Sequence, residues 1–195
     1  MTLERAGNLW HTQSMDDPQP IIDFWFSEAV RPRWFQSTDE FDQALIQRYE
    51  DIWQQAKHGK LDHWMQTAPG CLALVIILDQ FPLNMYRGTA KSFSTEARSR
   101  EIARHALELN FDAQMPVEQK AFLYMPFMHS EDMADQDRCL ELFEQPGLES
   151  NLRFARHHRG IIEKFGRFPH RNAPLGREST PAEIEYLNSR EAFTG

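Results

Sequence analysis

The segment GCLALVIILDQ, residues 70–80, decides the fold class of this 195-residue chain. It is apolar on every side, and its apolar run Cys71–Leu78 is far too short for the roughly 20 residues of a membrane span. A run of this kind suits a buried strand or a buried helix, so the flanking sequence must decide between them. The chain shows no sustained alternation of polar and apolar residues and no Asn-Gly or Asp-Gly hairpin. We therefore expect a buried helix in an all-α protein.

Amphipathic helices are predicted on both sides of this segment. The clearest spans residues 38–59, with Thr38 as N-cap and Gly59 at its end. Its apolar stripe consists of Phe41, Leu45, Tyr49, Ile52 and Ala56. Further helices are expected over 95–109, from Pro116 to a break or kink at Pro126, from a Ser130 cap to Pro146, over 148–165, and from a capping box at 180–183.

The predicted helices follow one another as helix–loop–helix pairs, which favours an array of antiparallel helix pairs. We expect a flexible N-terminal tail over residues 1–17 and a single all-α domain over 18–195. Residues 81–93 are predicted to be a loop. The similar stretches FPLN at 81–84 and FPHRN at 168–172 both follow an apolar helix, so we expect two similar helix corners.

Composition narrows the class of protein. Hydrophobic content of 41% and charged content of 26% are ordinary for a globular domain. The net charge of −8 opposes non-specific nucleic-acid binding. The N-terminus lacks the basic and apolar regions of a signal peptide, and Cys71 and Cys139 are expected to be buried, reduced thiols. These features favour a cytoplasmic protein without a membrane partner; the five tryptophans and fourteen phenylalanines suit a large core or a dimer face.

Charge is unevenly distributed near the C-terminus. Residues 131–149 carry seven acidic residues and one arginine, whereas residues 151–177 carry seven Lys or Arg residues and one glutamate. We expect the acidic and the basic helix to lie side by side and neutralise each other. That arrangement leaves the cations from Gly166 onward without an explanation.

Three segments are richer in polar groups than a helix connection requires. Proline and phenylalanine stiffen these segments, so their polar groups could form a preorganised binding site. Alternatively, the same groups satisfy helix ends or pair with one another. The candidate ligand-binding residues are Asp79, Gln80, Asn84, Arg87, Gln136, Arg167, His170, Arg171, Asn172 and Arg177.

His129 and Asp132 are the candidates for proton transfer, because a histidine near a carboxylate can act as a general acid or base. The alternative role for His129 is helix capping. The sequence contains no His-Glu-x-x-His, no Cys-x-x-Cys and no glycine-rich nucleotide motif. We therefore predict no metal site and no cofactor.

Several motifs in the same order resemble a family of bacterial proteins, domain of unknown function 924. The motifs, between Ile21 and Phe193, are DFWF, RWF, Phe41-Asp42, GKLDHW, LALVIILDQFPLNMYRGT, FLYMPFMHSEDMADQ and HRGIIEKFGRFPHRNAPLGRESTPAE. One departure is Leu83, where the family favours arginine. The resemblance implies a tetratricopeptide-like α-α superhelix and carries over no catalytic role.

Two functions fit these observations. In the first, the polar segments converge and the arginines hold a small anionic molecule, with or without catalysis. In the second, the helices form a tetratricopeptide-like module for a peptide or protein partner, and the polar segments are structural. If the first is right, His129 lies within about 4 Å of a carboxylate or arginine from another polar segment.

Overall fold

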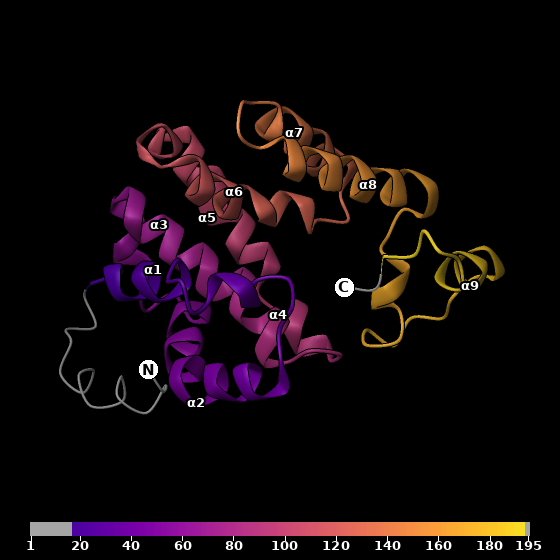
Figure 1. The fold of residues 1–195 in the computed structure, drawn as a ribbon, viewed down its shortest axis with the longest axis horizontal. Helices are drawn as coiled ribbons and strands as arrows, with labels where there is room; N and C mark the ends of the chain where they lie inside the picture. The colour runs from indigo at the N-terminus through magenta and orange to yellow at the C-terminus, as the bar shows by residue number, and fades with distance from the viewer. Residues whose placement is uncertain (1–16, 194–195) are drawn as a thin grey trace.

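The computed structural model describes residues 17–193 and contains no strand in that range (Figure 1). The α-helices are α1 (Gln19–Trp25), α2 (Asp39–Lys57), α3 (Ala68–Val75), α4 (Phe81–Met85), α5 (Glu96–Glu108), α6 (Val117–Met128), α7 (Met133–Phe143), α8 (Glu149–Phe165) and α9 (Pro181–Leu187). Shorter helical turns are η2 (Arg31–Arg33), η3 (Asp62–Gln66), η4 (Ile76–Gln80), η5 (Ala90–Phe93), η6 (Phe111–Gln114) and η7 (Pro169–Arg171). The predicted all-α class is confirmed, and the predicted tail lies almost wholly outside the described residues.

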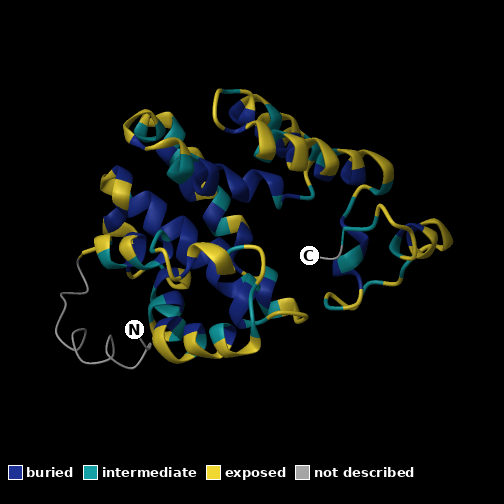
Figure 2. Ribbon diagram, viewed as in Figure 1, coloured by how far each residue is buried: buried dark blue, intermediate teal, exposed yellow. Residues whose placement is uncertain are grey.

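The segment 70–80 is helical, as predicted, and belongs to a longer buried run formed by α3, η4 and α4. Thr67 caps this run by accepting a hydrogen bond from the backbone of Gly70. A Cβ atom at Gly70 would lie 1.9 Å from the carbonyl oxygen of Trp64, so only glycine allows this close approach. Figure 2 shows the run as a buried strip through the N-terminal part of the molecule.

The prediction of a loop from Phe81 was wrong, because residues 81–85 continue the helix as α4. The preceding η4 is a π-helical turn, in which the backbone N–H of Phe81 bonds to the carbonyl of Ile76. Pro82 cannot donate to the carbonyl of Leu78, one turn earlier. The hydroxyl of Thr95 donates to that carbonyl instead, at 2.6 Å. The predicted similarity to residues 168–172 therefore fails, since the second stretch forms the separate short turn η7.

By length and composition, residues Ala68–Met85 could cross a membrane, but 89% of that window is buried inside the protein. The run packs against α1, α2, α5 and α6. It is the central helix of the hydrophobic core, which explains why the sequence is apolar on every side of it.

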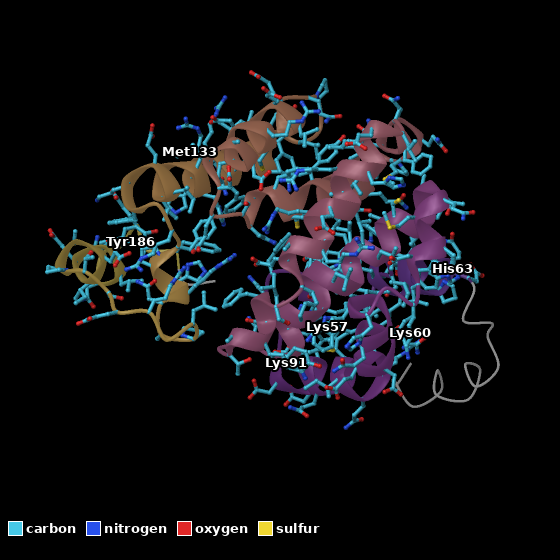
Figure 3. All side chains as sticks on the ribbon, turned by 180° about the vertical axis from the view of Figure 1, so that it is seen from behind. Lys57, Lys60, His63, Lys91, Met133 and Tyr186 are labelled. Atoms are coloured by element: carbon cyan, nitrogen blue, oxygen red, sulfur yellow. The ribbon has the colours of Figure 1, made fainter. Side chains whose placement is uncertain are left out.

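Helix α2 covers this core on one side. Its buried residues follow the predicted stripe in part, with Leu45, Tyr49, Trp53 and Ala56 turned inward. The ring of Tyr49 lies 4.8 Å from that of Phe81. Helix α2 is followed by Gly59 at a positive φ of 72°, where glycine avoids backbone strain. The second half of α2 approaches η5, where Nζ of Lys91 lies 3.1 Å from Oε1 of Glu50, and Figure 3 shows Lys57 and Lys91 close together in the lower middle of the view.

Replacing Thr38 with alanine should destabilise the protein by about 1 kcal/mol, because the Thr38 hydroxyl accepts from the Phe41 backbone at 3.3 Å. The change in unfolding free energy is measured by urea denaturation. Gln43→Ala, on the exposed face of α2, is the matched control and should change stability by less than about 0.5 kcal/mol. Equal effects of the two changes would contradict the capping role.

Helices α6, α7 and α8 follow one another and pack in sequence. A break or kink is predicted at Pro126; helix α6 continues to Met128, so the helix does not break there. Pro126 lies in the last turn, where it removes a single hydrogen bond and buried neighbours keep the helix intact. Asp132 rather than Ser130 caps α7, accepting from the backbone of Ala134 at 2.7 Å. The Ser130 hydroxyl instead donates to Asp135.

Beyond α8 the chain forms a smaller C-terminal lobe, drawn in yellow in Figure 1. Its apolar cluster contains Ile161, Ile162, Phe168 and Tyr186, separate from the large core. The predicted capping box at Thr180 and Glu183 is present and starts α9. The helices are thus confirmed as an all-α array, and a tetratricopeptide-like superhelix stays a prediction.

Candidate functional site

Four charged side chains from four parts of the chain form a buried group, which we call the polar quartet. Asp79 comes from η4, Glu96 from the first turn of α5, His129 from the end of α6, and Arg171 from η7. Nδ1 of His129 lies 2.9 Å from Oδ1 of Asp79, and Nη1 of Arg171 donates to Oε2 of Glu96 at 2.9 Å. The polar quartet therefore consists of two buried ion pairs that influence each other electrostatically.

Asp79 is completely buried because the run that carries it is surrounded by protein. Its second carboxylate oxygen accepts from Nε2 of Gln80 at 2.6 Å, so both oxygens have partners. Burying a carboxylate is costly unless its hydrogen bonds are satisfied. The position of Asp79 within an apolar helix thus depends on Gln80 and on His129.

His129 lies just after the last residue of α6, with its side chain 16% exposed. Burial by itself lowers the pKa of an imidazole, but the charge and hydrogen bond of Asp79, with the charge of Glu96, outweigh that effect and raise the pKa of His129. Because Nδ1 is turned to Asp79, the Nε2 edge is the one that remains for another group. This geometry suits proton transfer at Nε2.

Glu96 and Arg171 form the second buried pair, with side-chain exposures of 9% and 7%. The guanidinium of Arg171 lies against two aromatic rings, 4.5 Å from the centroid of Phe93 and 4.7 Å from that of Phe168. Burial raises the pKa of Glu96, although the charge of Arg171 opposes the shift. The two aromatic rings orient the guanidinium of Arg171 by cation–π attraction, in addition to the attraction of the Glu96 charge.

Several buried polar atoms in and around the polar quartet have no hydrogen-bond partner within residues 17–193. They are Nε of Arg171, Oε1 of Glu96, Oγ of Ser99 and Nδ1 of His170. Buried polar atoms are normally hydrogen-bonded, so unsatisfied ones need an explanation. Their concentration at this place marks the site as different from the rest of the core.

Two further histidines lie beside the polar quartet. Burial lowers the pKa of His158 to about 3, and burial together with the charge of Arg171 lowers that of His170 to about 4. The ring of Phe193 packs edge-on against both, with centroids 4.5 Å and 5.0 Å away. Both imidazoles are therefore held neutral at physiological pH.

A second polar network fixes the loop around η7. Glu131 accepts from both Nη atoms of Arg177 at 2.7 and 2.9 Å and from the backbone N–H of Phe168. Burial opposes ionisation, but these donors hold the pKa of Glu131 below its usual range. Nε of Arg177 donates to Asn172 at 2.9 Å. The donors of Arg177 are thus used within the protein.

Arg167 is likewise held by an internal carboxylate. It donates to both oxygens of Glu183, at 2.7 and 2.9 Å, and to the carbonyl of Glu178. The hydrogen bonds from Arg167 lower the pKa of Glu183 to about 2. Arg167 therefore ties α9 to the end of α8 and does not reach the polar quartet.

The remaining candidates lie outside the polar quartet. Asp132 is exposed and caps α7, away from the hydrogen bonds of His129. Nε2 of Gln136 donates to the carbonyls of Met128 and Ser130, so it satisfies the end of α6. Arg87 bonds to Asn84 and to Asp42, in a separate and more exposed group.

Sequence reasoning missed Glu96 because a glutamate in the first turn of a helix is ordinary. The available signal was the neighbouring Phe93, but a local pattern does not show that Arg171 lies opposite. The expected pairing of the acidic and basic helices is also limited: Arg159 bonds to Asp137 at 2.6 Å, whereas the exposed Arg156 has no ion pair within the described residues.

No group of three or more His, Cys, Asp and Glu side chains within the described part of the chain is arranged to hold a metal ion. Two open surface hollows occur elsewhere, one beside Arg104 and Asp135 and the other beside Lys164 and Thr180. Neither hollow is lined by a member of the polar quartet.

Comparisons with known proteins agree with this description. The structure of a protein of unknown function from Agrobacterium tumefaciens is similar, with 40% sequence identity, a TM-score of 0.83, and coverage of 88% of this chain and 96% of that chain. None of the curated proteins matches the sequence. The family model described as bacterial protein of unknown function, DUF924, matches residues 21–191. This chain belongs to the DUF924 family of bacterial proteins.

Proposed function

We propose that the polar quartet binds a small molecule through an anionic group, a carboxylate or a phosphate, with Arg171 as the anchor. The observation that carries this proposal is the unused edge of the guanidinium. Arg171 donates from Nη1 to Glu96, and its buried Nε has no partner among the described residues. Nε and Nη2 form the edge of arginine that binds an anion with two parallel hydrogen bonds.

His129 supplies the chemical capability of the proposed site. Its Nδ1 is held by Asp79, which leaves Nε2 for a bound molecule. The carboxylate partner in proton transfer is then Asp79 rather than Asp132, which caps α7. Arg167 and Arg177 serve the structure in this proposal, because internal carboxylates use their forks.

Replacing Arg171 with lysine should weaken the binding of small anions by at least about tenfold, since lysine keeps the charge but loses the planar two-bond edge. The probes are acetate and inorganic phosphate, and binding is measured by isothermal titration calorimetry at neutral pH. The same protein samples are compared for folding by circular dichroism.

The matched control is Arg156→Lys, the same change at an exposed arginine of α8. It should leave the affinities unchanged. An equal loss in both variants, or unchanged binding in the Arg171 variant, would contradict the proposed anchor. Failure of acetate, of inorganic phosphate and of glycine, a further small molecule with a carboxylate, to bind the unmodified protein would contradict the proposed function itself.

A further inference from the structure

We infer that the ligand of this site is amphoteric: a small molecule that carries an ammonium group close to its carboxylate, as an amino acid does. This inference rests on the proposed function, because it assigns the carboxylate to the free edge of Arg171. It goes further by assigning the ammonium group to Glu96. It also excludes phosphates and simple carboxylates as the preferred ligands.

Two buried atoms of the Arg171–Glu96 pair lack a hydrogen-bond partner in the described part of the chain, and one is a donor while the other is an acceptor. The free edge of Arg171 contains only donors and therefore needs an acceptor. Glu96 accepts from Arg171 at Oε2. Its other carboxylate oxygen, Oε1, is buried without a partner among residues 17–193 and needs a donor. A molecule that supplies both an acceptor and a donor satisfies both needs; acetate supplies no donor, and phosphate supplies one only together with a net negative charge.

The charged groups of the site also favour a zwitterion over an anion. The polar quartet pairs two carboxylates, those of Asp79 and Glu96, with two basic groups, the imidazole of His129 and the guanidinium of Arg171. Acidic and basic groups are thus matched one to one. A neutral zwitterion preserves the balance, whereas a buried anion adds a negative charge without a partner.

The room around the pair formed by Arg171 and Glu96 is limited. Arg171 and Glu96 are more than nine-tenths buried, and the rings of Phe93 and Phe168 lie against the guanidinium. The polar end of a ligand at the edge of Arg171 therefore has to be small, as the carboxylate and ammonium of an amino acid are. Ser99 Oγ, one turn further along α5 and also unpartnered, can donate or accept one more hydrogen bond.

The experiment compares three probes on the unmodified protein: glycine, which carries both groups, acetate, which carries the carboxylate alone, and inorganic phosphate. Binding is followed by calorimetry and by the ¹⁵N–¹H resonance of the Arg171 Nε–H group, identified by its loss in Arg171→Lys. Glycine should bind at least about tenfold more tightly than acetate, since it adds a charge-assisted hydrogen bond to Glu96. It should also shift the Nε–H resonance.

Other outcomes of this experiment would overturn the amphoteric ligand. Equal binding of glycine and acetate, or tighter binding of phosphate, overturns the amphoteric ligand and leaves the anion site of the proposed function standing. Absence of a resonance shift with all three probes overturns both, and the unpartnered atoms are then satisfied by water. The comparison of affinities by calorimetry uses no variant, so it does not depend on whether a substituted protein folds; Arg171→Lys is needed only to identify the resonance.

A variant tests the assignment to Glu96 directly. Glu96→Gln removes the negative charge that would hold the ammonium group, so the preference for glycine over acetate should be lost or reversed. Glu163→Gln, at an exposed position of α8, is the matched control and should keep the preference. A preference for glycine that survives in Glu96→Gln overturns the assignment of the ammonium group to Glu96.

Discussion

Replacing Arg171 with alanine is expected to destabilise the protein by about 3–5 kcal/mol, because it leaves the charge of Glu96 buried without its partner. The side chain of Glu96 is 9% exposed, and Nη1 of Arg171 donates to it at 2.9 Å. The loss should exceed the effect of removing an exposed arginine, which is close to zero. Unfolding free energies come from urea denaturation of the unmodified protein, Arg171→Ala and the control Arg156→Ala.

The second half of this experiment separates the ion pair from ordinary packing. Replacing both partners, as Glu96→Leu with Arg171→Met, should restore most of the lost stability, because an apolar pair needs no desolvation of charge. Partial or complete recovery in the double variant supports a buried charge as the cause. A double variant that is as unstable as the sum of its single variants would show that Arg171 contributes mainly by packing against Phe93 and Phe168.

Acid conditions should destabilise the protein strongly through His158, whose pKa burial lowers from 6.5 to about 3. The unfolded chain takes up a proton at this residue as the pH falls below 6.5, whereas the folded protein does not until about pH 3. Unfolding is therefore favoured progressively over that interval, and the contribution of His158 alone is ~2 kcal/mol at about pH 5. His170, with its pKa lowered to about 4, acts in the same direction.

The contributions of Glu183 and His129 to stability differ from that of His158 in their pH range or in their sign. Hydrogen bonds from Arg167 lower the pKa of Glu183 to about 2, so the stability it contributes is present above pH 4.5 and is lost below that value. The raised pKa of His129 means that its contribution is present below pH 6.5 and is lost as the pH rises through its folded pKa. The decrease between pH 6.5 and 4.5 therefore comes from His158 and His170.

The measurement is the unfolding free energy as a function of pH for the unmodified protein and for His158→Phe. The phenylalanine keeps the ring contacts with Phe168 and Phe193 but has no proton to bind. Its stability should fall less steeply between pH 6.5 and 4.5. His157→Phe, a neighbouring exposed position, is the matched control and should keep the original slope. Identical slopes in all three proteins would contradict the role of His158.

Much of the fold could be predicted because helix ends are encoded locally. Thr38 accepts from the third residue after it, and Thr180 forms a complete capping box with Glu183, as their sequence patterns indicate. The helical state of residues 70–80 followed from the absence of any partner strand. The helix beyond Phe81 could not be predicted, because it depends on a hydroxyl from Thr95 that lies on a different element.

The candidate site was predictable in part for the same reason. The sequence predicts Asp79, His129 and Arg171 as candidate site residues, and the fold places each of them in an ion pair at hydrogen-bond distance. The choice of Asp132 as the partner of His129 followed sequence proximity. In the structure Asp132 faces solvent and caps a helix, while the carboxylate at His129 comes from 50 residues earlier in the chain.

Local sequence specifies where these helices begin, how hydrophobic each face is and which residues are unusually polar, because capping and periodic burial act over one or two turns. Local sequence therefore specified that the segment GCLALVIILDQ is helical and that the protein is all-α. Which charges neutralise each other is a different matter, because an ion pair depends on distance in space and on burial. Only the packing of α5 and η7 placed Arg171 against Glu96, and only the folding of the chain around η7 and α9 brought Arg167 to Glu183 and Arg177 to Glu131.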